Sequence, residues 1–441
     1  MSNTNNAPAG SGRTPTTQET QAKVASSLRR RYRAEMRFRA YGIAAVSLGI
    51  LFVLFLFGSI ISKGWSTYRQ AEVQLDVYYD PQAIDPQGTR AEDTLRSADY
   101  QALIKDALQA QFPQVEGRDK LRELTRLVSS SAAYALQQRV LANPQLIGQR
   151  ETVGVLMNPD VDWLIKGRTL RSSSAEERRL SDQQVTWIDA LQQRGRIHLA
   201  FNRAFFTSGD SRDPEQAGVW GAVSGSFLTL VVTLLLSFPV GVAAAVYLEE
   251  FARRNRFTDV IEVNINNLAA VPSIVYGLLG LSVFINFFGL PRSAPLVGGL
   301  VLALLTLPTI IIASRAALKS VPPSIREAAL GMGASKLQTV AHHVLPLAMP
   351  GMLTGAIIGM ARALGESAPL LMIGMVAFIV EVPHRFTDAA TVLPVQIFLW
   401  SDSPERAFVE RTSGAIIVLL LFLLVMNATA VVLRSRFEKR W

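Results

Sequence analysis

The stretch VPPSIREAALGMGASKLQTVAHHVLPLAMP, residues 321–350, is a polar segment between two long apolar runs, and the organisation of the chain is clearest from it. Ser324 and Glu327 have the spacing of a capping box, which predicts a helix that begins at Ile325. Gly331 and Gly333 are expected to end that helix, because glycine readily adopts the backbone of a helix C-terminus. The segment is therefore expected to start with one short helix.

A second capping box follows in the same segment. Ser335 and Gln338 repeat the spacing, so a second short helix is expected from Lys336 toward His343. Three apolar residues lie at helical spacing and predict a small apolar patch: Leu330, Ala334 and Leu337. A short helix-turn-helix with such a patch is typical of a docking surface, and we call residues 320–346 the docking loop.

The docking loop resembles the EAA signature of the permease subunits of ABC importers. The resemblance is carried by these residues: Glu327, Ala328, Ala329, Gly333, Leu345 and Pro346. His343 departs from it, because an aliphatic residue is usual at that position. The resemblance implies that the loop docks on a separate ATP-hydrolysing subunit and transmits its closure to the membrane helices. The alternative is that Glu327 merely caps a helix in an ordinary loop.

Composition narrows the class of protein. Apolar residues make up 49% of the 441 residues, cysteine is absent, and the net charge is +9. The basic residues gather beside apolar runs, which predicts membrane topology and no nucleic-acid partner. No GxxxxGK[ST] phosphate loop occurs, so ATP with magnesium is expected on a partner subunit, and no cofactor on this chain.

The first half of the chain is expected to contain one membrane span and one small domain. Residues 1–40 are expected to form a disordered basic cytoplasmic tail. Residues 41–62 are expected to form a first transmembrane helix, and the rival interpretation of this apolar run is a cleaved signal peptide. Residues 63–216 predict a periplasmic α+β domain. Strands are expected at 73–79 and 152–157, and helices at 91–112, 118–141 and 181–194. His198 stands alone there and is interpreted as structural.

Residues 217–441 predict a membrane domain that contributes five more helices. These spans are expected at 219–247, 265–288, 296–313, 352–379 and 413–433. Pro272 and Gly277 predict a kink in the second of them. The fold class is an all-α polytopic membrane protein of six spans with the small α+β domain inserted. Both termini are expected in the cytoplasm, because the short basic clusters then fall on that side.

Two charges in the predicted span 352–379 are the main candidates for function. Arg362 and Glu366 lie four residues apart, on one face of a helix and near mid-bilayer, about 15 Å into the span. A charge there costs at least about 2.5 kcal/mol, so it must face a partner helix or a water-filled path. The forked guanidinium suits a tetrahedral oxyanion. A structural ion pair is the alternative. Arg315 is a weaker candidate at the inner mouth of a pathway.

Residues 247–281 and the segment ARALGESAPLL, 361–371, resemble the PstA family of phosphate-import permeases. The resemblance covers residue 218 to the C-terminus and implies a type I ABC importer in a bacterial inner membrane. It implies a second permease subunit of PstC type, an ATP-binding subunit dimer of PstB type and a periplasmic phosphate-binding protein of PstS type. It also implies that Arg362, Glu366 and Ser367 take part in phosphate passage. Residues 63–216 resemble the extra N-terminal domain of some longer members.

Other functions stay open at this point. The oxyanion could be sulfate or molybdate, because an arginine alone does not choose among such anions. A membrane sensor or scaffold for phosphate signalling is the alternative of another class. An enzyme is the least favoured reading, since the sequence has no nucleophile, metal or cofactor cluster.

Overall fold

The computed structural model describes residues 16–376 and 378–437 and divides into two units, Met1–Ser59 and Ile60–Trp441. Helix α1 (Thr17–Gly64) makes up the described part of the first unit and ends inside the second. The predicted disorder of residues 1–40 is therefore wrong from Thr17 onward, while residues 1–15 lie outside the described range. The reason is that alanine, arginine, glutamate and glutamine favour helix, so a helix formed by the apolar run extends back through them.

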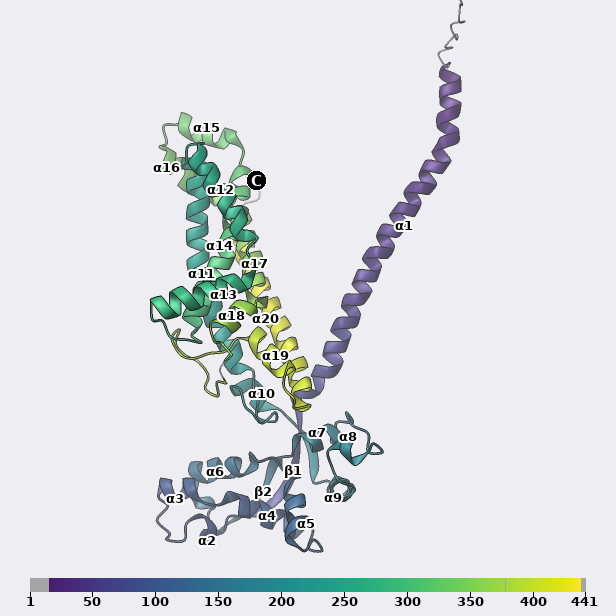
Figure 1. Ribbon diagram of the computed structural model, residues 1–441, viewed down its shortest axis with the longest axis vertical. Helices are drawn as coiled ribbons and strands as arrows, with labels where there is room; N and C mark the ends of the chain where they lie inside the picture. Colours follow the sequence, from purple (N-terminus) through teal and green to yellow (C-terminus); the bar gives the residue numbers. More distant parts are fainter. Residues whose placement is uncertain (1–15, 377, 438–441) are drawn as a thin grey trace, which may run out of the picture. The chain divides into compact units, whose positions relative to one another are not determined.

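The extramembrane part of the second unit is built on a three-stranded antiparallel sheet of order β2-β1-β3 (Figure 1). Its strands are β1 (Arg69–Tyr78), β2 (Arg150–Leu156) and β3 (Ile197–Phe201). Alternate β1 residues Ala71, Val73, Leu75 and Val77 are buried against helices, because successive strand side chains point to opposite faces. The strands predicted at 73–79 and 152–157 are present as β1 and β2. The structure adds β3, which is only five residues long and lies among charged residues, so the sequence pattern did not predict it.

The helices around this sheet are short. They are α2 (Pro81–Ile84), α3 (Glu92–Ser97), α4 (Tyr100–Gln111), α5 (Arg118–Thr125), α6 (Ala132–Ala142), α7 (Pro159–Ile165), α8 (Ala175–Arg178), α9 (Asp182–Gln193) and α10 (Arg203–Thr207), with 3-10 turns at Trp65–Tyr68 and Pro144–Leu146. The helix predicted at 91–112 is two helices, because the Asp99 side chain accepts hydrogen bonds from the amides that begin α4. The helix predicted at 118–141 is likewise divided into α5 and α6.

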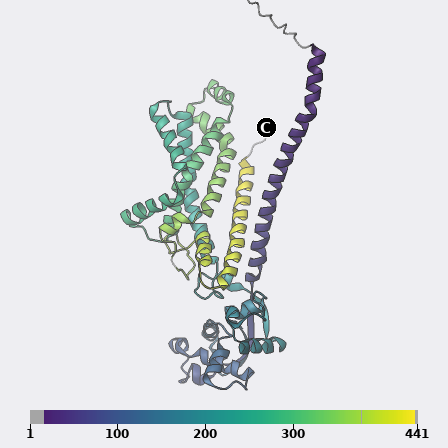
Figure 2. The ribbon, with the colours of Figure 1, turned by 45° about the vertical axis from the view of Figure 1, so that its right-hand side comes forward.

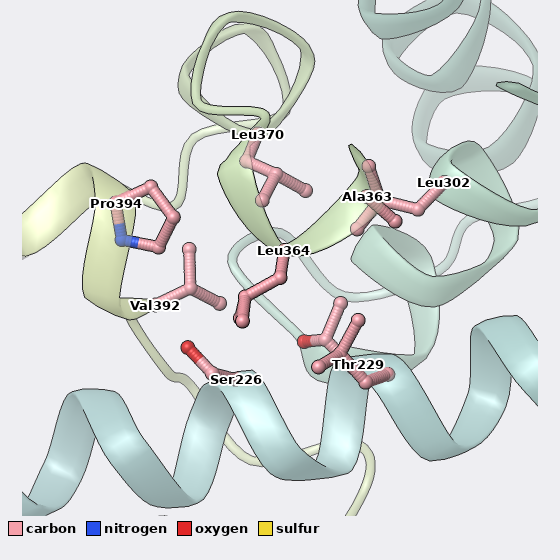
Figure 3. Close-up of a pocket in the computed structure, with 9 residues that line it drawn as sticks. Ser226, Thr229, Leu302, Ala363, Leu364, Leu370, Val392 and Pro394 are labelled. Carbon is pink, nitrogen blue, oxygen red and sulfur yellow. The ribbon is translucent and has the colours of Figure 1, made fainter. Parts of the chain in front are cut away.

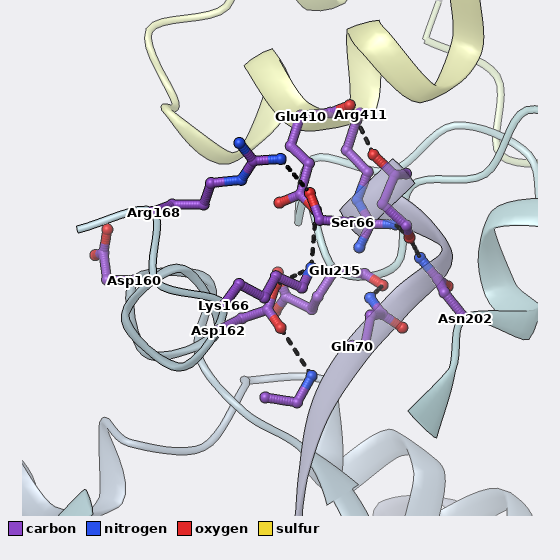
Figure 4. A network of polar contacts seen from close by, with 12 residues as sticks. Ser66, Gln70, Asp160, Asp162, Lys166, Arg168, Asn202, Glu215, Glu410 and Arg411 are labelled. Carbon is purple, nitrogen blue, oxygen red and sulfur yellow. Dashed lines mark hydrogen bonds and ion pairs between the residues drawn. The ribbon is translucent and has the colours of Figure 1, made fainter. Parts of the chain in front are cut away.

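Buried charges join the extramembrane part to the membrane helices (Figure 4). Lys166, after α7, has only 4% of its side chain exposed, and its Nζ lies 2.6 Å from Asp162 Oδ2 and 3.0 Å from Glu410 Oε1 in the first turns of α20 (Ala407–Phe437). Arg411 and Glu215 are buried in the same cluster. We call these five residues the junction cluster. Because it holds three carboxylates against two cations, its members depend on one another for neutralisation.

The pKa of Glu215 is raised, chiefly because burial disfavours its charged form, and the pKa of Asp162 is raised for the same reason. A carboxyl with a raised folded-state pKa makes the protein less stable as pH rises from the ordinary glutamate range through that raised pKa. Glu215→Gln should therefore weaken the loss of thermal stability that occurs as pH rises from the ordinary glutamate range through the raised pKa of Glu215. The measurement is thermal unfolding of the purified protein across that range.

Glu176→Gln is the matched control for this prediction, because Glu176 is exposed and has no hydrogen bond or ion pair with another described residue. Its pH profile should match that of the unsubstituted protein. An unchanged profile for Glu215→Gln would contradict the assignment of a raised pKa to Glu215.

The structure is mostly helical, and within its described residues five helices are long and apolar enough to span a membrane, or six with a bent pair counted as one span. The long spans are α1, α11 (Trp220–Val246), α14 (Pro295–Lys319), α17 (Leu345–Gly365) with its preceding turns, and α20. The bent pair is α12 (Arg256–Ala269) and α13 (Ser273–Leu279), followed by a π-helical segment, Gly280–Phe287. α14 packs against both α11 and α17, and α20 packs against α17 (Figure 2).

The remaining helices lie at the two ends of these spans. α15 (Pro323–Gly331) and α16 (Lys336–Thr339) form the docking loop at one end, and the sheet lies beyond the opposite end (Figure 1). A π-helical turn at Tyr247–Phe251 extends α11, and another at Val340–Val344 connects α16 to α17. Two short helices follow α17 in the chain: α18 (Ala368–Met372) and α19 (Leu393–Ser401). The predicted span 265–288 is the bent pair, with an angle of 103° at Pro272. Proline removes a backbone donor there, which explains the bend.

Candidate functional site

Arg362 lies in the last turn of α17, at a break in the helix. α17 ends at Gly365, and Glu366 has a non-helical backbone with φ −81° and ψ 120°. The prediction that Arg362 and Glu366 lie inside one helix is therefore wrong, because Glu366 lies just past the end of α17. Pro369 lacks an N–H and its ring would clash with the carbonyl of Gly365, so the helix does not continue through this segment.

The break still keeps the two predicted charges together. Arg362 Nε lies 3.6 Å from Glu366 Oε1, and the two side chains are 48% and 21% exposed. Ser367 is half-buried and precedes α18 without using its side chain as a cap. Since the contact with Glu366 occupies only part of the guanidinium, Arg362 retains donors for another oxygen ligand.

The depth of Arg362 follows from its packing against α14. A side chain added at Gly359 would meet Thr306 of α14 at 3.7 Å, and Ala363 lines a cavity together with Leu302. Leu302 is seven residues from Pro295, about 10 Å from the end of α14 that lies away from the docking loop. Arg362 therefore lies nearer that end than the predicted mid-bilayer position, although it is still within the length of the neighbouring helices.

Helix α13, of the bent pair, packs against α18, which follows the break after Arg362. A Cβ added to Gly277 of α13 would lie 2.7 Å from Pro369 Cα of α18, so only glycine permits this approach. A Cβ added to Gly280, the first residue of the π-helical segment after α13, would clash with the Val301 side chain of α14. The first of these contacts packs α13 closely against α18, directly after the break.

The space beside the break is small and apolar (Figure 3). It measures about 10 Å³, and its lining includes Leu364 of α17, Leu370 of α18 and Val392 beside α19. Such a space is about the size of one water molecule and is too small for an oxyanion. An anion that reached Arg362 would have to come from the exposed side of the break.

The docking loop has the two helices predicted for it, with two corrections. α15 begins at Pro323, and Ser324 does not cap it, because Pro323 already takes the first helical position, where its missing N–H costs nothing. The capping box of Ser335 and Gln338 is present. The second helix is not short, because α16 continues through π-helical turns into α17, past Leu345 and Pro346.

The exposed groups of the docking loop lie around its turn. Glu327 and Ala328 are exposed, Ala329 is buried, and Gly333 makes the turn with φ 87°. The side chain of Glu327 has no hydrogen bond or ion pair with another residue of the described chain. Three large apolar side chains stand beside it, at 50%, 79% and 67% exposure: Leu330, Met332 and Leu337. Met332 was missed by the helical-spacing argument because it lies in the turn.

Both helices of the docking loop are attached to the end of α11. Arg326 of α15 donates to Glu250 Oε1 at 2.7 Å through Nη2, and to the carbonyl of Val321 at 2.7 Å through Nη1. Lys336 of α16 lies 5.3 Å from the ring centroid of Phe251. A movement of the loop would therefore be carried to α11 as well as to α14 and α17. Sequence analysis overlooked Arg326, whose opposite charge to Glu250 was the available signal.

A double-mutant cycle tests the link between Arg326 and Glu250. We expect Arg326→Ala and Glu250→Ala each to destabilise the protein, with a coupling free energy of about 1.5–3 kcal/mol, because the hydrogen bond is between charged, largely buried groups. Unfolding in detergent micelles measures it. Additive effects of the two substitutions would show that the contact carries no energy. The same cycle on Arg96 and Glu92, an exposed pair, is the control.

Arg315 lies among acidic side chains. It pairs with Glu262 of α12, and its Nε is 3.5 Å from Glu249, which also lies 3.6 Å from Lys319. Arg315 is 15% exposed and borders a cavity of about 290 Å³ near the docking loop. Its role at the inner mouth of a pathway stays a prediction, and two carboxylates already neutralise the guanidinium.

Two family models match this chain. "Binding-protein-dependent transport system inner membrane component" matches residues 237–441, and "Domain of unknown function (DUF3333)" matches residues 25–175. The chain is 34% identical to "Phosphate transport system permease protein PstA 1" of Mycobacterium tuberculosis, over 52% of this chain and 74% of that protein. It is 31% identical to "Probable ABC transporter permease protein YqgI" of Bacillus subtilis, over 51% of this chain and 81% of that protein.

Solved structures are more distant. An inward-facing structure of the MetNI methionine ABC transporter aligns with a TM-score of 0.41 and 19% identity, over 50% of this chain and 98% of that chain.

Proposed function

This chain belongs to the family of binding-protein-dependent transport system inner membrane components, and we propose that it is the PstA-type permease subunit of an ATP-driven phosphate importer. The assignment of phosphate as the substrate is supported by the 34% identity to a phosphate permease over 74% of that protein. As a subunit of an ABC permease it performs transport and carries no catalytic domain. Family members work with an ATPase and a binding protein.

Arg362 provides the chemistry for the proposed substrate. A guanidinium offers fixed, forked donors that match two oxygens of a phosphate. Its partly exposed position at a helix break allows an anion to approach from the exposed side of the break, where we expect the second, PstC-type permease subunit. Glu366 would hold the guanidinium between substrates, and Ser367 would offer a hydroxyl beside it.

The docking loop provides the coupling in this proposal. The unpartnered Glu327 and the exposed side chains Leu330, Met332 and Leu337 suit docking on a PstB-type ATP-binding subunit. ATP-magnesium on that subunit would close it and move α15. The Arg326–Glu250 contact would pass this movement to α11. A change between inward- and outward-facing states needs such differential contacts in the two states.

The proposed subunit lies in a bacterial inner membrane with both termini in the cytoplasm. The 63–216 region then faces the periplasm, where a PstS-type protein would deliver phosphate. This orientation rests on the basic clusters beside the spans.

Radiolabelled phosphate uptake tests the substrate. A strain that lacks this chain and keeps the partner subunits should regain uptake at low external phosphate when the chain is supplied, and excess sulfate or molybdate should not compete. Competition by either anion would instead indicate a permease for another oxyanion. Restored phosphate signalling without restored uptake would indicate a sensor or scaffold.

A further inference from the structure

Four large apolar side chains of the extramembrane part are exposed and lie outside its hydrophobic core. Trp65, Leu170, Phe201 and Phe206 are 64%, 69%, 62% and 36% exposed. They come from three separate segments: the turn after α1, the loop after α7, and β3 with α10. Single exposed apolar residues are ordinary, but a group of this size on one region indicates a binding surface. We call these four residues the apolar collar.

Three members of the apolar collar are joined by ring contacts. Phe201 and Phe206 stack in parallel, with centroids 5.6 Å apart and 2° between the planes. Phe206 also stacks on Tyr68 at 5.4 Å, and Tyr68 meets the edge of Trp65 at 5.9 Å. The exposed rings therefore form one continuous surface.

The collar lies at the level where the membrane spans begin. Trp65 directly follows α1, and the Tyr68 hydroxyl donates to the carbonyl of Gly414, in the second turn of α20. Near Leu170, Arg168 donates to the carbonyls of Ser62 and Lys63 at 2.9 and 3.0 Å. All three collar segments thus reach the last turn of α1 or the residues that follow it.

α10 shows that the collar faces away from protein. Phe205 is fully buried against Trp400 and Phe408 at the end of the membrane helices, while the next residue, Phe206, is exposed. Successive helical residues point about 100° apart, so one turn of α10 contacts the helix bundle and presents an aromatic ring outward.

Basic side chains accompany the aromatic ones. Lys63, Arg69 and Arg203 are exposed, and their side chains make no ion pair or hydrogen bond with another described residue. Tryptophan, tyrosine and phenylalanine rings beside lysine and arginine are the combination favoured where hydrocarbon meets lipid headgroups. This charge pattern favours a lipid surface over a second protein.

We propose that the extramembrane part of this chain is seated on the surface of the bilayer through the apolar collar, with the three basic residues meeting lipid phosphates. The collar inserts at headgroup depth beside the last turn of α1 and limits rocking of the sheet relative to α20. This proposal uses only the membrane location of the family and does not depend on which solute is carried.

Depth-dependent quenching tests the proposal, and the lack of native cysteine makes the labelling clean. Leu170→Cys and Phe201→Cys each receive a bimane label in the full chain, which is reconstituted with its partner subunits in phosphatidylcholine vesicles that contain doxyl lipid. Tyr134→Cys is the matched control, because Tyr134 is 60% exposed on α6 and is no member of the collar. Leu170 lies in a loop, so its substitution leaves the core intact.

We expect doxyl lipid to quench the labels at 170 and 201 strongly, and iodide in the buffer to quench only the label at 134. Quenching of all three labels by iodide alone would overturn the proposal. Labels at 170 and 201 that neither quencher reaches would also overturn it, because a protein partner would then cover the collar.

Discussion

Arg362→Ala is expected to lower specific phosphate uptake by about 10- to 100-fold, because one charge-assisted hydrogen bond to the anion contributes about 1.5–3 kcal/mol. Arg362→Lys should recover part of the loss, since lysine keeps the charge but lacks the forked pair of donors. Initial uptake rates, normalised to the amount of the chain in the membrane, provide the measurement.

Arg292→Ala is the matched control for this substitution. Arg292 is an exposed arginine in the turn before α14, at the same end of the helices as Arg362. Its removal should leave uptake unchanged. If Arg362→Ala reduces only the amount of protein, with normal uptake per molecule, the arginine is structural and its assignment to the anion pathway is wrong.

Lys166→Met is expected to lower the free energy of unfolding by about 3–5 kcal/mol, because it leaves Asp162 and Glu410 buried without their shared cation. The loss should appear first as separation of the extramembrane part from α20. Thermal unfolding in detergent and the rate of limited proteolysis of the folded protein measure these two effects.

A neutral partner should reverse part of that loss. With Asp162→Asn added to Lys166→Met, one buried carboxylate is removed together with the cation, and Glu410 keeps the buried Arg411 as its opposite charge. Arg96→Met serves as control, because Arg96 forms an exposed pair with Glu92 and should contribute nothing measurable. Equal effects of Lys166→Met and Arg96→Met would refute a stabilising role for the junction cluster.

Local signals in the sequence were sufficient for several elements. The second capping box predicts α16 because Ser335 and Gln338 satisfy each other's backbone within four residues. Period-2 alternation predicts β1, and Pro272 predicts the bend between α12 and α13. The long apolar runs predict the spans, because crossing a bilayer imposes a length and a composition on each segment.

Hydropathy alone placed the end of α17 wrongly, although Pro369 was a local signal for a bend. Hydropathy continues past Gly365, so the sequence predicts one helix through Glu366. The structure ends α17 at Gly365, where Pro369 cannot follow in the helix and where Gly277 of α13 holds Pro369 from the other side. Arg362 and Glu366 still form a pair, because they are only four residues apart in the chain. The depth of Arg362 along the membrane helices depends on how α17 packs against α14.

By itself, the sequence of this protein determined the long apolar helices, the two short helices of the docking loop and the closeness of Arg362 to Glu366, because each is a pattern within a few helical turns. Only the tertiary structure decided that Arg326 meets Glu250, that Lys166 joins α7 to α20, and that Phe201 and Phe206 form one surface with Trp65 and Tyr68. These contacts bring together residues that are distant in the chain. Burial and packing create such pairs, and no local propensity encodes them.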